Sequence, residues 1–153
     1  MAKQSAGILL YRIADSQLEV FLVHPGGPFF KNKDEGSWSI PKGEFADDEN
    51  PLDAAKREFK EETGQSIYGD FIKLTPIQQK GGKTVCAWAV EGDIDHERIV
   101  SNVFEIEWPP RSGKKRTFPE IERAAWFDME TAKKKINLAQ AAFVDELSLK
   151  IIS

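Results

Sequence analysis

The chain has 153 residues, of which 41% are hydrophobic and 30% are charged, and its formal net charge is −4 at pH 7. A chain of this length buries roughly 68–70% of the surface that its unfolded form exposes. We therefore expect residues 1–153 to form one domain. The acidic balance argues against a surface that holds long nucleic acid through its phosphates. Any phosphorylated partner is expected to be small.

The beginning of the chain contains a short apolar run that Arg12 interrupts. This run predicts neither a full signal peptide nor a membrane span. The single cysteine, Cys86, cannot form an internal disulfide, which fits a reducing compartment. We therefore expect a cytoplasmic protein with no membrane partner, in which Cys86 is structural.

Branched and aromatic residues cluster over residues 6–13 and 18–24 and predict two strands of a hairpin, with a turn at Asp15 and Ser16. The Pro- and Gly-rich run 24–28 ends the second strand. From there to Ser37 the sequence predicts a surface loop, of a length that is often functional.

The clearest helix is predicted over residues 51–63. Asn50 is a favoured N-cap, Pro51 suits the first helical position, and Gly64 supplies a left-handed stop. Further strands are predicted over 67–79, 83–90, 103–108 and 124–127, the first two as a hairpin around Gly81 and Gly82. Residues 109–116 predict an irregular basic loop, and two helices are predicted at about 129–136 and 138–151, the latter with Ala142, Phe143 and Leu149 among its apolar positions.

Three glutamates of the predicted 51–63 helix share one turn. Glu58, Glu61 and Glu62 stand at i, i+3 and i+4, so their carboxylates repel each other unless solvent, Lys, Arg or cations compensate. Taken alone, the three residues are explained as well by a solvated acidic face. Their spacing to residues before and after them in the chain adds information.

That spacing runs from Gly43 to Gly64. Gly43 is followed after five residues by Glu49 and after seven more by Arg57-Glu58-Phe59, and single residues then separate this group from Glu61-Glu62 and Glu61-Glu62 from Gly64. At residue frequencies of roughly 5–7% each, chance would produce these identities at fixed offsets in on the order of one chain in a million.

Residues 43–65 resemble the Nudix box: Gly, five residues, Glu, seven residues, Arg-Glu-hydrophobic, one residue, Glu-Glu, one residue, Gly, hydrophobic. Every polar and glycine position matches, and Gln65 stands where the family usually has an aliphatic residue. The order of the surrounding elements is also similar to the Nudix fold. The resemblance implies a single Nudix hydrolase domain with an α/β fold, an α/β/α sandwich in which a mixed β-sheet lies between helices and the box forms a loop-helix-loop.

The resemblance also implies a metal site. In the family the box carboxylates bind Mg²⁺ or Mn²⁺, which carries over to Glu58, Glu61 and Glu62, often with a backbone carbonyl just before the box glycine, here that of Lys42. The implied reaction is the hydrolysis of a phosphoanhydride by metal-activated water, in a nucleoside polyphosphate or a dinucleoside polyphosphate.

Support for that reaction is implied as well. Glu49 and Arg57 would form an internal ion pair that orients the metal-binding carboxylates. Family members recruit the general base from different places, and our first choice is Glu58. Later candidates, for which solvent-facing charge is the plainer interpretation, are Glu105, Glu107, Glu120 and Glu122, and of these we prefer Glu105 and Glu120.

The residues expected to recognise the substrate are inferred from weaker resemblances. Residues 38–44 are similar to the box entry of Nudix enzymes that act on diadenosine polyphosphates or diphosphoinositol phosphates, and parts of 104–120 to small bacterial Nudix proteins described as predicted nucleoside triphosphate pyrophosphohydrolases. Trp38 would stack on a base, although a tryptophan in a strand is more often core. The basic residues expected to contact substrate are Lys42, Lys83, Arg111, Lys114 and Arg116, and a solvated basic loop explains the last three about as well.

Two classes of function stay open: the hydrolase, and a catalytically silent Nudix domain that senses a nucleotide without turning it over. Inositol pyrophosphates and nucleotide sugars are alternative substrates within the first. No Walker-type phosphate loop and no nucleophile elbow occurs in the sequence, which excludes kinase and serine-hydrolase interpretations. The strand predicted at 83–90 and the C-terminal helix are apolar enough to allow a homodimer.

Overall fold

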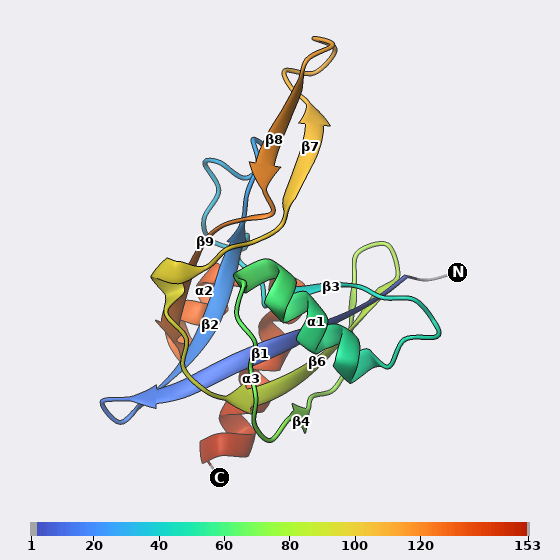
Figure 1. Cartoon of the computed structure of the whole chain (residues 1–153). Helices are drawn as coiled ribbons and strands as arrows, with labels where there is room; N and C mark the ends of the chain where they lie inside the picture. The colour runs from blue at the N-terminus through green and yellow to red at the C-terminus, as the bar shows by residue number, and fades with distance from the viewer. Residues whose placement is uncertain (1–2, 153) are drawn as a thin grey trace.

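A computed structural model describes residues 3–152 of the chain. Its centre is a mixed sheet with the strand order β4-β6-β1-β2-β9 (Figure 1). Strand β1 (Gln4–Ala14) pairs in parallel with β6 (Lys83–Glu91) and antiparallel with β2 (Gln17–Pro25), and β2 pairs antiparallel with β9 (Ile121–Asp128). Three short strands complete it: β3 (Lys42–Glu44) on β1, and β4 (Ile72–Lys73) and β5 (Ile77–Gln79) on β6.

Helices cover both faces of this sheet. Helix α1 (Pro51–Thr63) packs over one face, where Ile8 and Leu10 of β1 join its buried Phe59. Helices α2 (Met129–Lys135) and α3 (Ala141–Ile152) cover the other face, where Leu9 and Tyr11 of β1 join their apolar residues. Alternate residues of one strand therefore serve two cores, and the predicted α/β/α sandwich is confirmed.

The bounds of α1 are those that the sequence predicts. The side chain of Asn50 accepts hydrogen bonds from the backbone N–H groups of Leu52 (3.0 Å) and Asp53 (3.1 Å), which have no partner inside the helix. Gly64 ends the helix in the left-handed conformation, with φ of 77°, and its N–H donates to the carbonyl of Lys60. These caps fix which turn carries the glutamates.

Beyond α1, the expected 67–79 strand is wrong: only β4 and β5 are strands, and Ile67 and Phe71 instead pack as irregular chain against the core below α1. The expected 124–127 strand is longer, because β9 pairs with β2 from Ile121 onward.

The basic segment is also more regular than expected. Strand β8 (Lys115–Pro119) begins inside the predicted 109–116 loop and pairs with β7 (Val103–Glu107) in a separate hairpin that projects from the body (Figure 1). The alternation predicted for β7 is confirmed, since Phe104 and Ile106 are half-buried and Glu105 is exposed.

The C-terminal segment begins as a short 3₁₀ turn, Leu138–Gln140, before α3. Within α3, Phe143 is buried as predicted, but Ala142 and Leu149 are exposed, because Val144 and Leu147 supply the inward face instead. The apolar residues of β6, expected to offer surface to a second copy, are largely in the two cores. Among residues 3–152, no helix has both the length and the apolar character that a membrane crossing requires.

Candidate active site

One turn of α1 carries Glu58, Glu61 and Glu62 and is called the acidic turn below. Strand β3 lies directly against it. A Cβ atom added to Gly43 would lie 2.0 Å from Oε2 of Glu58, so only glycine permits this approach without displacing the carboxylate. The backbone N–H of the preceding residue, Lys42, donates to Oε1 of Glu62 at 3.3 Å. The first residues of the motif are thus brought onto its last turn, which places Lys42, Glu58 and Glu62 together.

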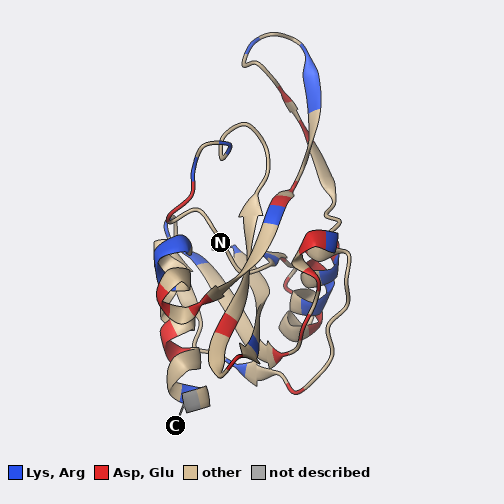
Figure 2. Cartoon of the chain, turned by 90° about the vertical axis from the view of Figure 1, so that its left-hand side faces the viewer, with Lys and Arg blue, Asp and Glu red and all other residues tan. Residues whose placement is uncertain are grey.

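Arg57 organises the carboxylates around this turn. Its Nε and Nη2 each donate to an oxygen of Glu49 at 2.9 Å, a bidentate pair that confirms the predicted ion pair. Its Nη1 also donates to Glu58 at 2.9 Å and to Glu61 at 3.2 Å. One guanidinium therefore holds three carboxylates in place, and Figure 2 shows the acidic and basic residues side by side on α1.

Burial makes the charged forms of Glu58, Glu62 and Lys42 costly. Burial raises the pKa of Glu62 to about 8. Burial, followed by the negative charge of Glu61, raises the pKa of Glu58, and Glu120 adds to the effect on both Glu58 and Glu62. Burial, followed by the charge of Lys83, lowers the pKa of Lys42, so this ammonium only partly compensates.

These residues fit a divalent cation. The carboxylates are hard oxygen donors of the kind that Mg²⁺ and Mn²⁺ prefer, and a cation would relieve the cost of charge on the half-buried Glu58 and Glu62. Across residues 3–152 no three acidic, histidine or cysteine side chains already surround a common point, and Arg57 engages oxygens of Glu58 and Glu61. A cation would therefore share these two carboxylates with Arg57.

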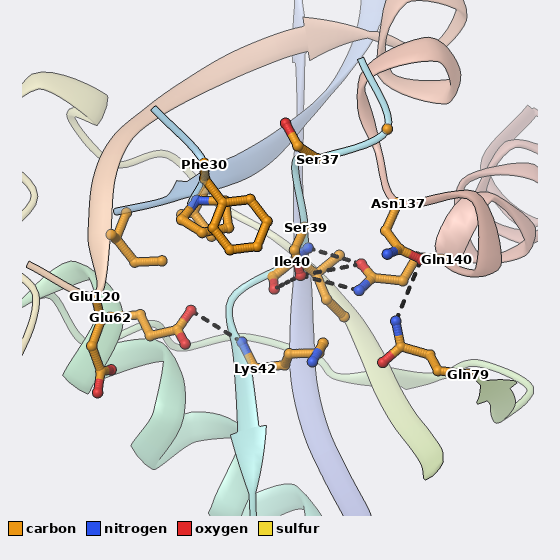
Figure 3. Close-up of a pocket in the computed structure, with 14 residues that line it drawn as sticks. Phe30, Ser37, Ser39, Ile40, Lys42, Glu62, Gln79, Glu120, Asn137 and Gln140 are labelled. Carbon is orange, nitrogen blue, oxygen red and sulfur yellow. Dashed lines mark hydrogen bonds between the residues drawn. The ribbon is translucent and has the colours of Figure 1, made fainter. Parts of the chain in front are cut away.

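A cavity of about 260 Å³ opens beside Lys42 and Glu62. Figure 3 shows Glu62 and Glu120 on one side of it and Gln79, Asn137 and Gln140 on the other. The cavity therefore brings Glu120 to the acidic turn, as expected for a candidate base. Glu105 is not brought there: it lies on the exposed face of β7 and pairs with Lys115 at 3.8 Å.

The predicted substrate contacts separate into two groups. Lys42 lines this cavity, and Lys83 lines a neighbouring hollow that shares Gln79 and Asn137 with it. Arg111 and Lys114 are exposed on the connection between β7 and β8, and Arg116 lines a different cavity. The basic residues therefore do not form a single phosphate clamp.

Trp38 lies in the core, contrary to the prediction that its ring stacks on a base. The side chain is 3% exposed, and its ring packs edge-on against Phe127 and His24. Its Nε1–H donates to Asp34 at 2.8 Å. The alternative of a core tryptophan matches this position.

Gln140 is a site residue that the sequence reasoning missed. It is 1% exposed, and its Oε1 accepts from the backbone N–H of Ile40 at 3.0 Å while its Nε2 donates to Ser39 at 3.1 Å. These bonds fix the chain just before Lys42. Because the partners are 100 residues apart, no local pattern could reveal the contact. Phe30, which also lines the cavity, was signalled only by the long loop that contains it.

Comparison with curated proteins finds two relatives from Saccharomyces cerevisiae: mRNA-decapping enzyme subunit 2 of strain YJM789 and m7GpppN-mRNA hydrolase of strain ATCC 204508 / S288c. Each is 31% identical over 100 residues, and the match covers 64% of this chain but only 9% of the relative. The chain thus matches a small part of much longer proteins.

Among solved structures, a C. elegans Ap4A hydrolase binary complex is similar with a TM-score of 0.66 and 20% identity, covering 99% of this chain and 98% of the other. The NUDIX domain of Shewanella oneidensis NrtR complexed with ADP ribose has a TM-score of 0.63 and 15% identity, covering 100% and 90%. At these identities the likeness shows the fold. The family model of the NUDIX domain matches residues 1–147, and with the box residues placed as described, the chain belongs to the NUDIX domain family.

Proposed function

We propose that the chain hydrolyses a phosphoanhydride bond in a nucleoside polyphosphate or a dinucleoside polyphosphate, with the help of Mg²⁺ or Mn²⁺. The observation that carries the proposal is the meeting of Lys42 and Gly43 with Glu58 and Glu62 at the edge of a cavity. Membership of the family supports it, as do relatives named Ap4A hydrolase and m7GpppN-mRNA hydrolase.

Each residue of the turn has a role in this proposal. Glu58, Glu61 and Glu62 would hold the cation, with the carbonyl of Lys42 as a further ligand. A bound divalent cation supplies positive charge for phosphate oxygens and makes a nearby water more acidic. Arg57, fixed by Glu49, keeps the carboxylates of Glu58 and Glu61 oriented before substrate arrives.

A carboxylate beside the cavity would accept the proton of the attacking water. Glu58 is our first choice as general base, because its carboxylate lies on the acidic turn against Gly43 and is held by Arg57. Glu120 is the second choice, because it lines the cavity together with Glu62. The ammonium of Lys42 lines the same cavity and would pair with a phosphate oxygen.

The test is product formation from a panel of substrates. Purified protein is incubated with Mg²⁺, Mn²⁺ or EDTA and with nucleoside triphosphates, dinucleoside polyphosphates, ADP-ribose or inositol pyrophosphates, in ¹⁸O-labelled water. We expect cation-dependent cleavage of a nucleotide, with ¹⁸O in the product phosphate that water attacked. Tight nucleotide binding without any product would reject the hydrolase and favour the sensing domain.

A further inference from the structure

A second cavity, of about 490 Å³, lies between the β7–β8 hairpin and the loop that follows β2. The hairpin contributes Trp108, Arg116 and Phe118 to its lining, and the loop contributes Lys31. The volume is within the range of roughly 300–1,000 Å³ that is typical of small-molecule sites. Nothing in the proposed hydrolysis uses this cavity.

The hairpin turns one chemically distinct face toward the loop. Phe104 pairs with Phe118 and Ile106 pairs with Arg116, so these side chains share a face, and Trp108 continues the same alternation. The opposite face, which includes Glu105 and Thr117, is exposed. Aromatic rings and a guanidinium therefore gather on the side that lines the cavity.

Close contacts hold the walls of this cavity together. Gly27 adopts a φ of 94°, and a Cβ atom added to it would lie 2.8 Å from the ring of Phe104. The N–H of Gly26 donates to the carbonyl of Glu120 at 2.9 Å, and the rings of Phe29 and Trp108 meet edge-on at 5.6 Å. The loop and the hairpin are packed on each other, so the cavity has defined walls.

The lining suits a flat, electron-rich ring attached to negative charge. The aromatic residues Trp108 and Phe118 line the cavity, and the guanidinium of Arg116 lies over the ring of Phe118, 5.7 Å from its centroid. Nucleobases stack on aromatic rings and on guanidinium planes with little demand on sequence. Two cations, Arg116 and Lys31, outnumber the one lining carboxylate, Glu122, whose oxygens could accept hydrogen bonds from base amino groups.

The two cavities share their dividing wall. Pro25 and Glu120 line the cavity beside the acidic turn, and their chain neighbours Gly26 and Pro119 line the hairpin cavity. We propose that the hairpin cavity binds the base of a nucleotide substrate whose phosphates lie beside Lys42 and Glu62. This inference rests on the proposed function and deepens it, because inositol pyrophosphates have no planar ring for such a site.

The first test compares substrates with and without a base. Trp108→Leu and Arg116→Gln are assayed on the best nucleoside polyphosphate of the panel and on inorganic tripolyphosphate. Loss of one stacking partner should lower kcat/KM for the nucleotide by roughly ten-fold or more, mainly through KM, with tripolyphosphate unchanged. Trp108→Phe should retain most of the nucleotide activity, because it keeps an aromatic face.

Matched controls separate recognition from folding. Thr117→Val alters the exposed face of the same hairpin, and Arg98→Gln removes an exposed positive charge outside it. Both should leave nucleotide KM unchanged, and thermal unfolding should show all variants folded. The inference is overturned if Trp108→Leu affects nucleotide and tripolyphosphate equally, or affects neither.

A binding experiment keeps the inference testable if no turnover is found. AMP, GMP, CMP and UMP are titrated by calorimetry against wild type, Trp108→Leu and Thr117→Val without divalent cations. Weaker binding to Trp108→Leu alone would support a base site even if the proposed hydrolysis failed. Equal binding to all three proteins would reject the base site even if hydrolysis were observed.

Discussion

The acidic turn of α1 and the hairpin cavity are built in opposite ways. Around the turn, Glu49, Arg57 and the three glutamates come from one short segment whose helix is fixed by its own caps. The hairpin cavity combines a loop after β2 with strands much later in the chain. The carboxylates proposed to hold the cation are thus placed locally, and the groups proposed for recognition of the base are placed by tertiary packing.

Glu62→Gln is the strongest test of the acidic turn. The substitution keeps the shape of the side chain but removes a proposed ligand charge, so kcat/KM should fall by at least roughly 100-fold. Steady-state kinetics at saturating Mg²⁺ measures this. Glu97→Gln, which changes an exposed glutamate on the His96–Arg98 turn, serves as the control and should have no effect. Full activity in Glu62→Gln would place the chemistry elsewhere.

In the metal-free protein, the effect of the same variant on thermal stability should depend on pH. The folded pKa of Glu62 is raised to about 8, above its usual 4.5, so ionisation of this group disfavours the folded state increasingly as pH rises from about 4.5 to about 8. Glu62→Gln removes that cost. Its Tm relative to wild type should therefore rise across this window, as followed by thermal denaturation in EDTA, and a difference independent of pH would contradict the burial of this charge.

Gly43→Ala tests the contact that completes the acidic turn. The new methyl would overlap the carboxylate of Glu58 and force it or β3 to move. Because displacements of about 1 Å at a reacting centre cost up to roughly 100-fold, we expect kcat/KM to fall by roughly 10–100-fold. The affinity for Mn²⁺, measured by electron paramagnetic resonance, should weaken in parallel. Unchanged kinetics would mean that Glu58 needs no exact placement.

Arg57→Lys tests whether the carboxylates of the acidic turn must be held in place, and its expected effect is smaller. A lysine cannot reproduce the bidentate bond to Glu49 together with the bonds to Glu58 and Glu61, so kcat/KM should fall by roughly ten-fold. Glu49→Gln should have a comparable effect alone but add little in the Arg57→Lys background, because the two residues act as one unit. Simple additivity in this double-mutant cycle would show that the pair does not act through a shared orientation.

The contrast between the regions also explains what the sequence could predict. Asn50 and Gly64 act at the ends of one helix, and local signals predicted both as the structure has them, whereas the Glu49–Arg57 pair was implied by the resemblance to the Nudix box and is present. The strand at Lys115 depends on pairing with β7, and the bond from Ile40 to Gln140 crosses the fold, so neither has a local signal. For Trp38 the sequence left base stacking and a core position open, and its packing against Phe127 and His24 decides for the core.

Asp34→Asn tests how the loop that lines the hairpin cavity is attached to the body, and its effect should be the smallest. Asp34 forms an ion pair with Lys135 of α2 and accepts from Nε1 of Trp38 at 2.8 Å, which ties the loop after β2 to a helix 101 residues away. The bond to Lys135, then that to Trp38, lowers the pKa of this exposed carboxyl below its usual 3.8. The ionised group therefore contributes stability above about pH 3.8, and that contribution is lost as pH falls through the lowered pKa.

Asp34→Asn should reduce Tm slightly at pH 7 and by less as the pH drops below 3.8. The control Asp47→Asn should leave Tm unchanged at pH 7 and in acid. A Tm difference that persists in acid would mean that something other than the carboxylate charge of Asp34 attaches the loop, such as the glycine contacts and the packing of Phe29 on Trp108.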